Sequence, residues 1–381
     1  APFAARTFYF AVVTIMAWAF FAMRSRRVHP GVWVVLIAMT SVLGYFGARG
    51  LNELQRYLEN AVTSWIGQFA RRESDLRESQ TALGRIGRVK LSSKIILRAE
   101  PQDGLQPPAY LREVSYDTYR NTVWRANRQE SGELTIETND VWRFHPEIPP
   151  KSSVLLSGYL RRGKGLLALP AGTVELRHLT VGNVQTNVMG VTRVEEGTKF
   201  IRFFALSSPD ASNDSPPEAD DLQIPEEDDA VITQVAEELG LTAPGTAFDE
   251  KLRILRSFFA THFEYSTYIT ARHVDPERRR SAVSVFLTEA RSGHCEYFAT
   301  ATVLLARKAG IPARYATGFA VHEASGKNMY VIRERDAHAW ALVYRPTPNG
   351  GGKWEDFDTT PASWIDAERE RASFWQPIAD M

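Results

Sequence analysis

The sequence predicts an α+β protein anchored in a membrane by its N-terminus. Two long apolar runs without charge open the chain, and short alternating strands with glycine and proline turns follow them. The C-terminal part combines helical periodicity with strands of period two. At 381 residues the chain is too long for one ordinary domain, so two or three are expected.

Residues 1–50 are predicted to form two transmembrane helices. Thr7 to Met23 carries 17 residues without a charge and Gly31 to Ala48 carries 18, just enough to cross a bilayer at about 1.5 Å per residue. A buried hairpin of core helices is the alternative. A cleaved signal peptide fits less well, because the basic cluster at residues 24–27 follows the first apolar run instead of preceding it.

The arginines near these runs predict how the spans are oriented. By the positive-inside rule, the three arginines between the runs place that loop in the cytoplasm and everything after Ala48 outside. Four arginines beyond the second run favour the opposite orientation, namely Arg49, Arg56, Arg71 and Arg72. We expect the remainder of the chain to be extracytoplasmic.

Three segments of different composition follow. Residues 51–85 have an apolar stripe at helical spacing and are predicted to form an amphipathic stalk helix. Residues 86–206 alternate in short runs punctuated by turns, which indicates a small β-domain, either a sandwich or a barrel. Residues 207–227 contain no Lys or Arg and little to bury, so they are predicted to be an acidic flexible linker.

The overall composition excludes several classes of function. Lys plus Arg and Asp plus Glu balance at 45 each, without the basic excess typical of nucleic-acid binding. A single cysteine rules out an internal disulfide and a cysteine-cluster metal site, and the eight histidines show no ligand spacing. We expect no nucleic-acid partner, no metal and no cofactor. The oligomeric state is not predicted.

Cys295 is the only cysteine and the first candidate for catalysis. It follows a glycine turn and opens a helical pattern that runs to about Ala309. A helix N-terminus directs free N–H groups and the positive end of the dipole at the sulfur, which favours the thiolate. The alternative is an inert buried thiol, and the residues downstream favour a nucleophile.

A predicted hairpin supplies the partners that a nucleophilic thiol needs. His338 opens an alternating strand, a turn rich in proline and glycine follows, and Asp358 closes a second strand. A turn about Pro348 would place His338 directly opposite Asp358, with Asp356 as the diagonal neighbour. The hairpin therefore offers a carboxylate to orient an imidazole, which in turn takes the thiol proton.

Residues 228–381 contain the helices and strands that would hold these three side chains. Four helices and two strands are predicted besides the hairpin: Asp228–Leu239, Phe248–His262, Ser281–Thr288 and Cys295–Ala309, then Arg314–Val321 and Met329–Arg335. A helix followed by an antiparallel sheet is an α+β arrangement.

These motifs resemble the core of bacterial membrane-anchored transglutaminase-like proteins, the TgpA group. The resemblance rests on residues 281–287, 293–301, 309–319, 336–340 and 357–360. It implies a papain-like core in which a cysteine helix packs on an antiparallel sheet, with Cys295 as nucleophile, His338 as base and Asp358 as the orienting carboxylate. Two positions depart from the family pattern. Asp358 is followed by Thr359 instead of proline, and Leu342 stands where glutamate is usual.

The implied activity is acyl transfer from a side-chain or peptide amide of a protein or peptide, through a thioester on Cys295. The backbone N–H of Cys295 would contribute to the oxyanion site, with Tyr265 as a candidate second donor. Amide hydrolysis with the same three residues and a non-catalytic membrane-anchored binding protein are the alternatives. The resemblance also implies the bacterial cytoplasmic membrane, with the catalytic domain outside.

Overall fold

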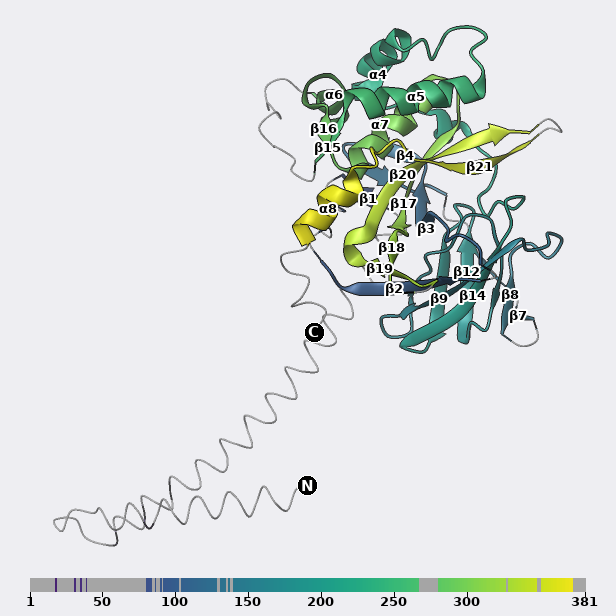
Figure 1. The fold of residues 1–381 in the computed structure, drawn as a ribbon, viewed down its shortest axis with the longest axis vertical. Coiled ribbons are helices and arrows are strands. Elements are labelled where there is room, and N and C mark those ends of the chain that lie inside the picture. The colour runs from purple at the N-terminus through teal and green to yellow at the C-terminus, as the bar shows by residue number, and fades with distance from the viewer. Residues whose placement is uncertain are drawn as a thin grey trace. The chain divides into compact units, whose positions relative to one another are not determined.

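The computed structural model describes residues 80–83, 92–102, 104–128, 131–134, 136–137, 140–266, 280–326, 328–347 and 351–372, with a few isolated positions (Figure 1). The two predicted transmembrane helices and most of the predicted stalk lie outside the described residues. Among those described, no helix combines the length and the apolar character needed to cross a membrane. The end of the stalk prediction is wrong, because Gln80–Ala82 form strand β1 and pair with β5 (Val123–Arg125).

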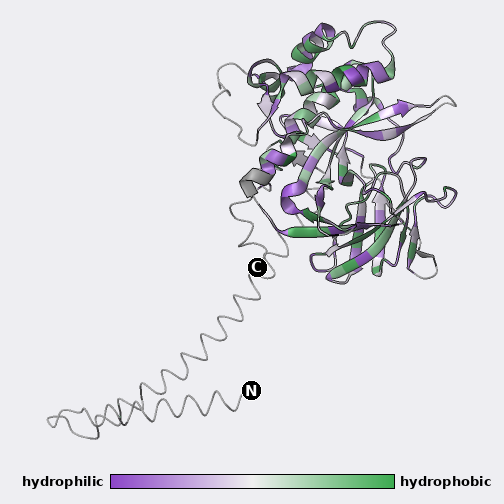
Figure 2. Ribbon diagram, in the orientation of Figure 1, coloured by the Kyte–Doolittle hydropathy of each residue, from purple (hydrophilic) through white to green (hydrophobic). Residues whose placement is uncertain are grey.

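The largest sheet has eight strands in the order β18-β19-β2-β9-β14-β11-β8-β7. Their bounds are Glu323–Ala324, Tyr330–Arg333, Ile95–Pro101, Ser152–Tyr159, Phe200–Ser207, Thr173–Arg177, Val141–Arg143 and Ile136–Glu137. Hydrophobic and hydrophilic segments are interspersed along its long strands (Figure 2), and residues such as Leu156 and Phe203 are turned to the core. The predicted β-rich character of this region is confirmed.

Two smaller sheets complete the β-rich part. One has the order β10-β13-β12-β6, and the other places β5 between β1 and β4. The remaining bounds are Gly165–Leu166 for β10, Thr192–Gly197 for β13, Val181–Asn187 for β12, Ser131–Glu133 for β6 and Thr118–Arg120 for β4.

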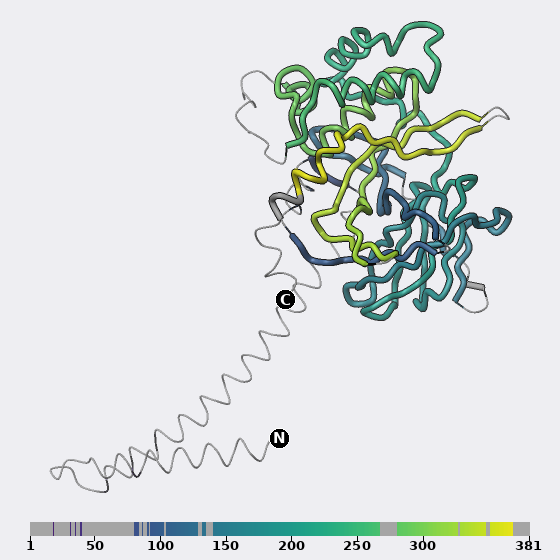
Figure 3. Tube along the Cα trace, viewed as in Figure 1, coloured from purple at the N-terminus to yellow at the C-terminus, as the bar shows by residue number. Residues whose placement is uncertain are grey.

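The sheet that carries the candidate site has the antiparallel order β21-β20-β17-β3, and we call it the site sheet. Its strands are Gly352–Phe357, Ala337–Pro346, Ala313–Ala320 and Tyr110–Tyr116. The early strand β3 thus lies beside strands from the end of the chain (Figure 3). The eight-stranded sheet likewise joins β2 to β19. Residues 86–206 and 228–381 are therefore not separate folding units, and residues 74–381 form one compact unit.

The four helices predicted after residue 228 lie within a few residues of their expected positions. They are α4 (Glu226–Glu238), α5 (Phe248–His262), α6 (Ala282–Val285, continued by a π-turn over Phe286–Ala290) and α7 (Cys295–Lys308). The described residues also include α8 (Trp364–Ala372), which was not predicted. Almost every side chain of α7 is buried, and the helix packs against β20 and β17. Figure 1 shows α4, α5 and α6 grouped with it. The α+β class is confirmed.

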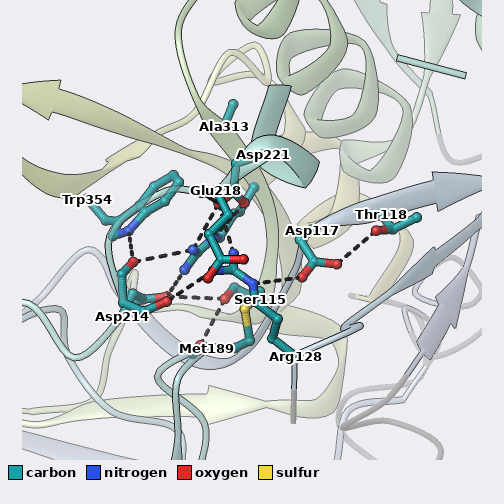
Figure 4. Close-up of polar contacts among 12 residues, drawn as sticks. Ser115, Asp117, Thr118, Arg128, Met189, Asp214, Glu218, Asp221, Ala313 and Trp354 are labelled. Atoms are coloured by element: carbon teal, nitrogen blue, oxygen red, sulfur yellow. Dashed lines mark hydrogen bonds and ion pairs between the residues drawn. The ribbon is translucent and has the colours of Figure 1, made fainter. Parts of the chain in front are cut away.

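The segment predicted as a flexible linker is held in place by buried carboxylates. Asp221 is fully buried and accepts two hydrogen bonds from Arg314, Nε to Oδ1 at 2.8 Å and Nη2 to Oδ2 at 3.0 Å, and one from Arg128 at 2.9 Å (Figure 4). Asp214 contacts Arg314 and Arg112. The linker prediction is wrong here because a buried guanidinium needs carboxylate partners, and this acidic segment supplies them.

Gly318 lies on β17 between Arg112 of β3 and His338 of β20, its two pairing partners. A Cβ there would lie 2.0 Å from the Leu111 carbonyl oxygen and 2.8 Å from the Arg112 Cα, both backbone atoms that cannot turn aside. We expect Gly318→Ala to lower the free energy of unfolding by about 1–3 kcal/mol, the usual cost of overpacking.

Denaturant melts would measure this cost. Gly132→Ala is the matched control, because a Cβ on that strand glycine meets nothing within 4 Å. Equal midpoints for Gly318→Ala and Gly132→Ala would show that β3 can move away from β17 freely, contrary to the close packing described above.

Candidate active site

The candidate nucleophile is the first residue of helix α7. The short strand β16 (Ser292–Gly293) pairs with β15 (Glu264–Tyr265) and delivers the chain to the helix. His294, the N-cap residue, has extended backbone angles and makes no capping hydrogen bond with its side chain. Cys295 is therefore at the positive end of the helix dipole, and its side chain is fully buried.

His338 and Asp358 form a pair beside this thiol, with His338 fully buried and Asp358 about 12% exposed. His338 lies on β20 with no exposed surface, and its Nε2 is 2.7 Å from Oδ2 of Asp358. The backbone N–H of Thr360 donates to the other carboxylate oxygen at 2.8 Å. The second ring nitrogen of His338, Nδ1, is not bonded to Asp358, and the Cys295 thiol interacts with the same imidazole. The structure thus brings all three predicted side chains together, and their catalytic roles remain predictions.

The predicted hairpin register is wrong by two residues. Leu342 lies opposite Asp356 and Ala341 opposite Phe357, where pairing ends, so His338 does not face Asp358 across a ladder. The loop closes with a bond from Thr347 N–H to the Gly351 carbonyl, and Gly351 has a φ of +86° that favours glycine. Because the loop closes at Thr347 and Gly351, β21 starts at Gly352 and the pairing is displaced by two residues from the predicted register.

Asp358 nevertheless reaches His338, because it follows the last paired residue and is free of the sheet ladder. Asp356 is used differently, since its Oδ1 accepts a hydrogen bond of 2.6 Å from the Trp340 indole. The two carboxylates, two residues apart, therefore bind different rings.

The charges around His338 favour the imidazolium. Burial alone would lower its pKa, but the Asp358 carboxylate and the Cys295 thiol raise the pKa of His338 to about 9. Burial would raise the pKa of Asp358, but His338 and the Thr360 hydrogen bond hold it below its usual value. For Asp356 burial dominates, and its pKa is raised despite the Trp340 hydrogen bond.

Burial keeps two side chains near the thiol, His294 and Tyr265, in their neutral forms. Burial, helped by the nearby Lys90 ammonium, lowers the pKa of His294 to about 3. Burial and the neighbouring Cys295 and Glu368 side chains raise the pKa of Tyr265. Its hydroxyl donates to Glu368, so the proton that the candidate oxyanion role requires is already committed in this structure.

Two aromatic residues that sequence reasoning missed contact the His338–Asp358 pair. Trp364, the first residue of α8, stacks on the imidazole at 4.7 Å between ring centroids and is 5% exposed. Tyr110, on β3, donates its hydroxyl to Asp358 Oδ2 at 2.8 Å. Trp364 lies only six residues beyond Asp358 and could have been suspected on that ground. Nothing local marks Tyr110, which reaches the site only through the pairing of β3 with β17.

The family comparison agrees with the location of this site. The family model of the transglutaminase-like superfamily core matches residues 233–359, a range that contains Cys295, His338 and Asp358. The chain therefore carries a transglutaminase-like core domain.

Two curated proteins align with part of the chain. The uncharacterized protein YebA of Bacillus subtilis (strain 168) is 36% identical over 99 residues, which is 25% of this chain and 13% of that protein. A protein-glutamine gamma-glutamyltransferase of Pseudomonas aeruginosa is 36% identical over 72 residues, 19% of this chain and 11% of that protein. The alignments thus cover only a small part of either relative.

Among solved structures, the periplasmic domain of TgpA from Pseudomonas aeruginosa is similar to this chain. The TM-score is 0.54 at 19% identity, and the match covers 78% of this chain and 98% of that one. The same domain bound to ethylmercury gives the same score over 77% of this chain. At this identity the likeness concerns the fold alone.

Proposed function

We propose that this chain, which carries a transglutaminase-like core domain at residues 233–359, is a membrane-anchored cysteine acyltransferase. Its substrate would be a side-chain or peptide amide of a protein. The observation that carries the proposal is the group of Cys295, His338 and Asp358, in which a buried thiol, a buried imidazole and a partly buried carboxylate come together in the order that nucleophilic catalysis requires.

Acylation would proceed as follows. The Cys295 thiolate attacks the amide carbonyl, and the backbone N–H of Cys295 stabilises the developing oxyanion. The His338 imidazolium then gives its proton to the nitrogen as the C–N bond breaks, releasing ammonia from a side-chain amide and leaving a thioester. Asp358 holds the imidazole through Nε2, so that Nδ1 is the nitrogen that exchanges the proton.

In the second half an amine would attack the thioester. His338, now neutral, accepts the proton of the amine as the new C–N bond forms and the C–S bond breaks, which restores the thiolate–imidazolium pair. Water in place of the amine would give hydrolysis. The burial of Cys295 and His338, both without exposed surface, favours transfer because it limits the access of water to the thioester.

The proposed location is the outer side of a bacterial cytoplasmic membrane. The two apolar runs within residues 1–50 support anchoring, and the arginines between them support an extracytoplasmic catalytic region. The similar solved structure is that of a periplasmic domain, which is consistent with that placement.

An amine-incorporation assay tests the proposed activity. The full chain in detergent micelles is given a glutamine-containing protein and a fluorescent primary alkylamine, and both incorporated label and released ammonia are measured. Incorporation together with ammonia release is expected. Ammonia release without incorporation would instead support the amidase alternative.

The Cys295→Ala variant is the negative control and should lose both signals. Silence of the wild type, while Cys295 is alkylated by iodoacetamide well below pH 8, would contradict acyl transfer on these substrates. Silence together with a thiol that reacts only after unfolding would favour the non-catalytic binding protein.

The raised pKa of His338 predicts a loss of activity at alkaline pH. The imidazolium donates the proton in acylation, and it persists until the pH rises through the folded-state pKa of about 9. We therefore expect kcat/KM for ammonia release to fall as the pH rises through about 9. If kcat/KM of the wild type instead falls near pH 6.5, the ordinary pKa of histidine, His338 is not the proton donor.

A further inference from the structure

Tyr110 belongs to the β-rich part of the chain, yet its hydroxyl reaches the candidate catalytic carboxylate. It opens β3, where it pairs with Ala320 of β17, and the adjoining Val321 N–H donates to the Ala109 carbonyl at 2.9 Å. This register fixes the backbone of Tyr110 at the end of the site sheet. The phenol then extends to Asp358.

The hydroxyl of Tyr110 and the imidazole of His338 bind the same oxygen. Oδ2 of Asp358 accepts Tyr110 OH at 2.8 Å and faces His338 Nε2 at 2.7 Å, while Oδ1 accepts the Thr360 N–H at 2.8 Å. With three donors in fixed positions, the carboxylate has one orientation. Hydrogen bonds to a buried charged group are among the strongest that proteins make.

The Tyr110 ring is fixed as well as its hydroxyl. It stacks on Trp340 at 4.7 Å between centroids and lies within 5° of parallel to the His338 ring at 5.7 Å. Burial and the Asp358 charge raise the pKa of Tyr110, so the phenol stays protonated and remains a donor. The ring cannot turn away without losing both contacts.

We propose that Tyr110 is a positioning residue for the reaction: it fixes the Asp358 carboxylate that orients His338, and so makes catalysis depend on strand β3. Tyr110 acts through Asp358 and touches no reacting atom. The inference rests on the proposed acyl transfer for its kinetic consequence. Its effect on the His338–Asp358 pair does not require turnover and can be measured separately.

Tyr110→Phe removes the hydroxyl and keeps the ring. Without this donor the buried carboxylate is less stabilised, so the coupled pair binds protons more tightly. We expect the apparent pKa of His338 to rise by about one unit, because the free energy of one hydrogen bond to a charged group corresponds to a shift of about that size. The titration is followed by NMR of the imidazole C–H signals in the full chain, with His338 assigned by its absence in His338→Gln.

We also expect Tyr110→Phe to lower kcat by about ten- to a hundred-fold and to leave KM nearly unchanged. The hydrogen bond from Tyr110 to Asp358 helps to orient the base and does not bind substrate. Tyr119→Phe is the matched control. Its hydroxyl is buried and lacks a hydrogen-bond partner among the described residues, so its deletion should alter neither the pKa of His338 nor kcat.

A double-mutant comparison shows whether Tyr110 acts through the carboxylate. In an Asp358→Asn background, Tyr110→Phe should cause little further change in the His338 titration. The inference is overturned if folded Tyr110→Phe keeps the wild-type pKa of His338, or if it shifts that pKa equally with and without Asp358. If the wild type shows no acyl transfer, the proposed function is wrong, and the His338 titration alone then decides whether Tyr110 positions Asp358.

Discussion

Asp358→Asn is expected to lower kcat by about 10⁴-fold, the loss known for the equivalent change in a serine protease. An amide can bond the imidazole in the wrong tautomer, and it carries no charge to stabilise the imidazolium. The wild-type carboxylate is 2.7 Å from Nε2 and is one of the two groups that raise the pKa of His338 to about 9. The same variant should therefore move the alkaline limb of kcat/KM to lower pH.

Asp356→Asn is the matched control, because the same change is made two residues away on the same segment. Asp356 bonds the Trp340 indole at 2.6 Å, and an asparagine oxygen can accept that bond. A far smaller loss of kcat is expected, with thermal melts confirming that both variants fold. The reverse ranking, with Asp356→Asn inactive and Asp358→Asn active, would mean that the wrong carboxylate has been assigned to His338.

The candidate site was predictable to the extent that it depends on local pattern. Cys295 was placed by a glycine turn ahead of a helical run, and α7 does begin there. His338 and Asp358 were placed by two strands on either side of a turn. The hairpin pattern offers two carboxylates near His338, Asp356 and Asp358, and the structure pairs Asp358 with His338.

The errors share one physical cause, which is that long-range contacts outweigh local pattern. The register depends on which glycine adopts a positive φ, and residues 350–352 are all glycine. The acidic segment looked like a linker because its partners, Arg314 and Arg128, are distant in sequence. The contribution of β3 to the site sheet has no local signature, so the sequence predicts a separate β-domain over the range that contains Tyr110.

The second large effect concerns stability. Asp221→Asn is expected to lower the free energy of unfolding by about 3–5 kcal/mol, the usual result of removing one partner from a buried ion pair. Arg314 has no exposed surface and loses the carboxylate that accepts two of its hydrogen bonds, while its contact with Asp214 at 3.3 Å remains. Denaturant melts of the full chain would measure the loss.

Glu250→Gln is the control, because it breaks the exposed contact of Glu250 with Arg253 and should leave the melt almost unchanged. Asp221→Asn should also make residues 207–221 a site of limited proteolysis, since this segment owes its fixed position to the buried carboxylates. If Asp221→Asn melts like the wild type and the segment is cut at the same rate in both, the ion pair with Arg314 does not hold it. The flexible linker expected from the composition would then describe the protein in solution better.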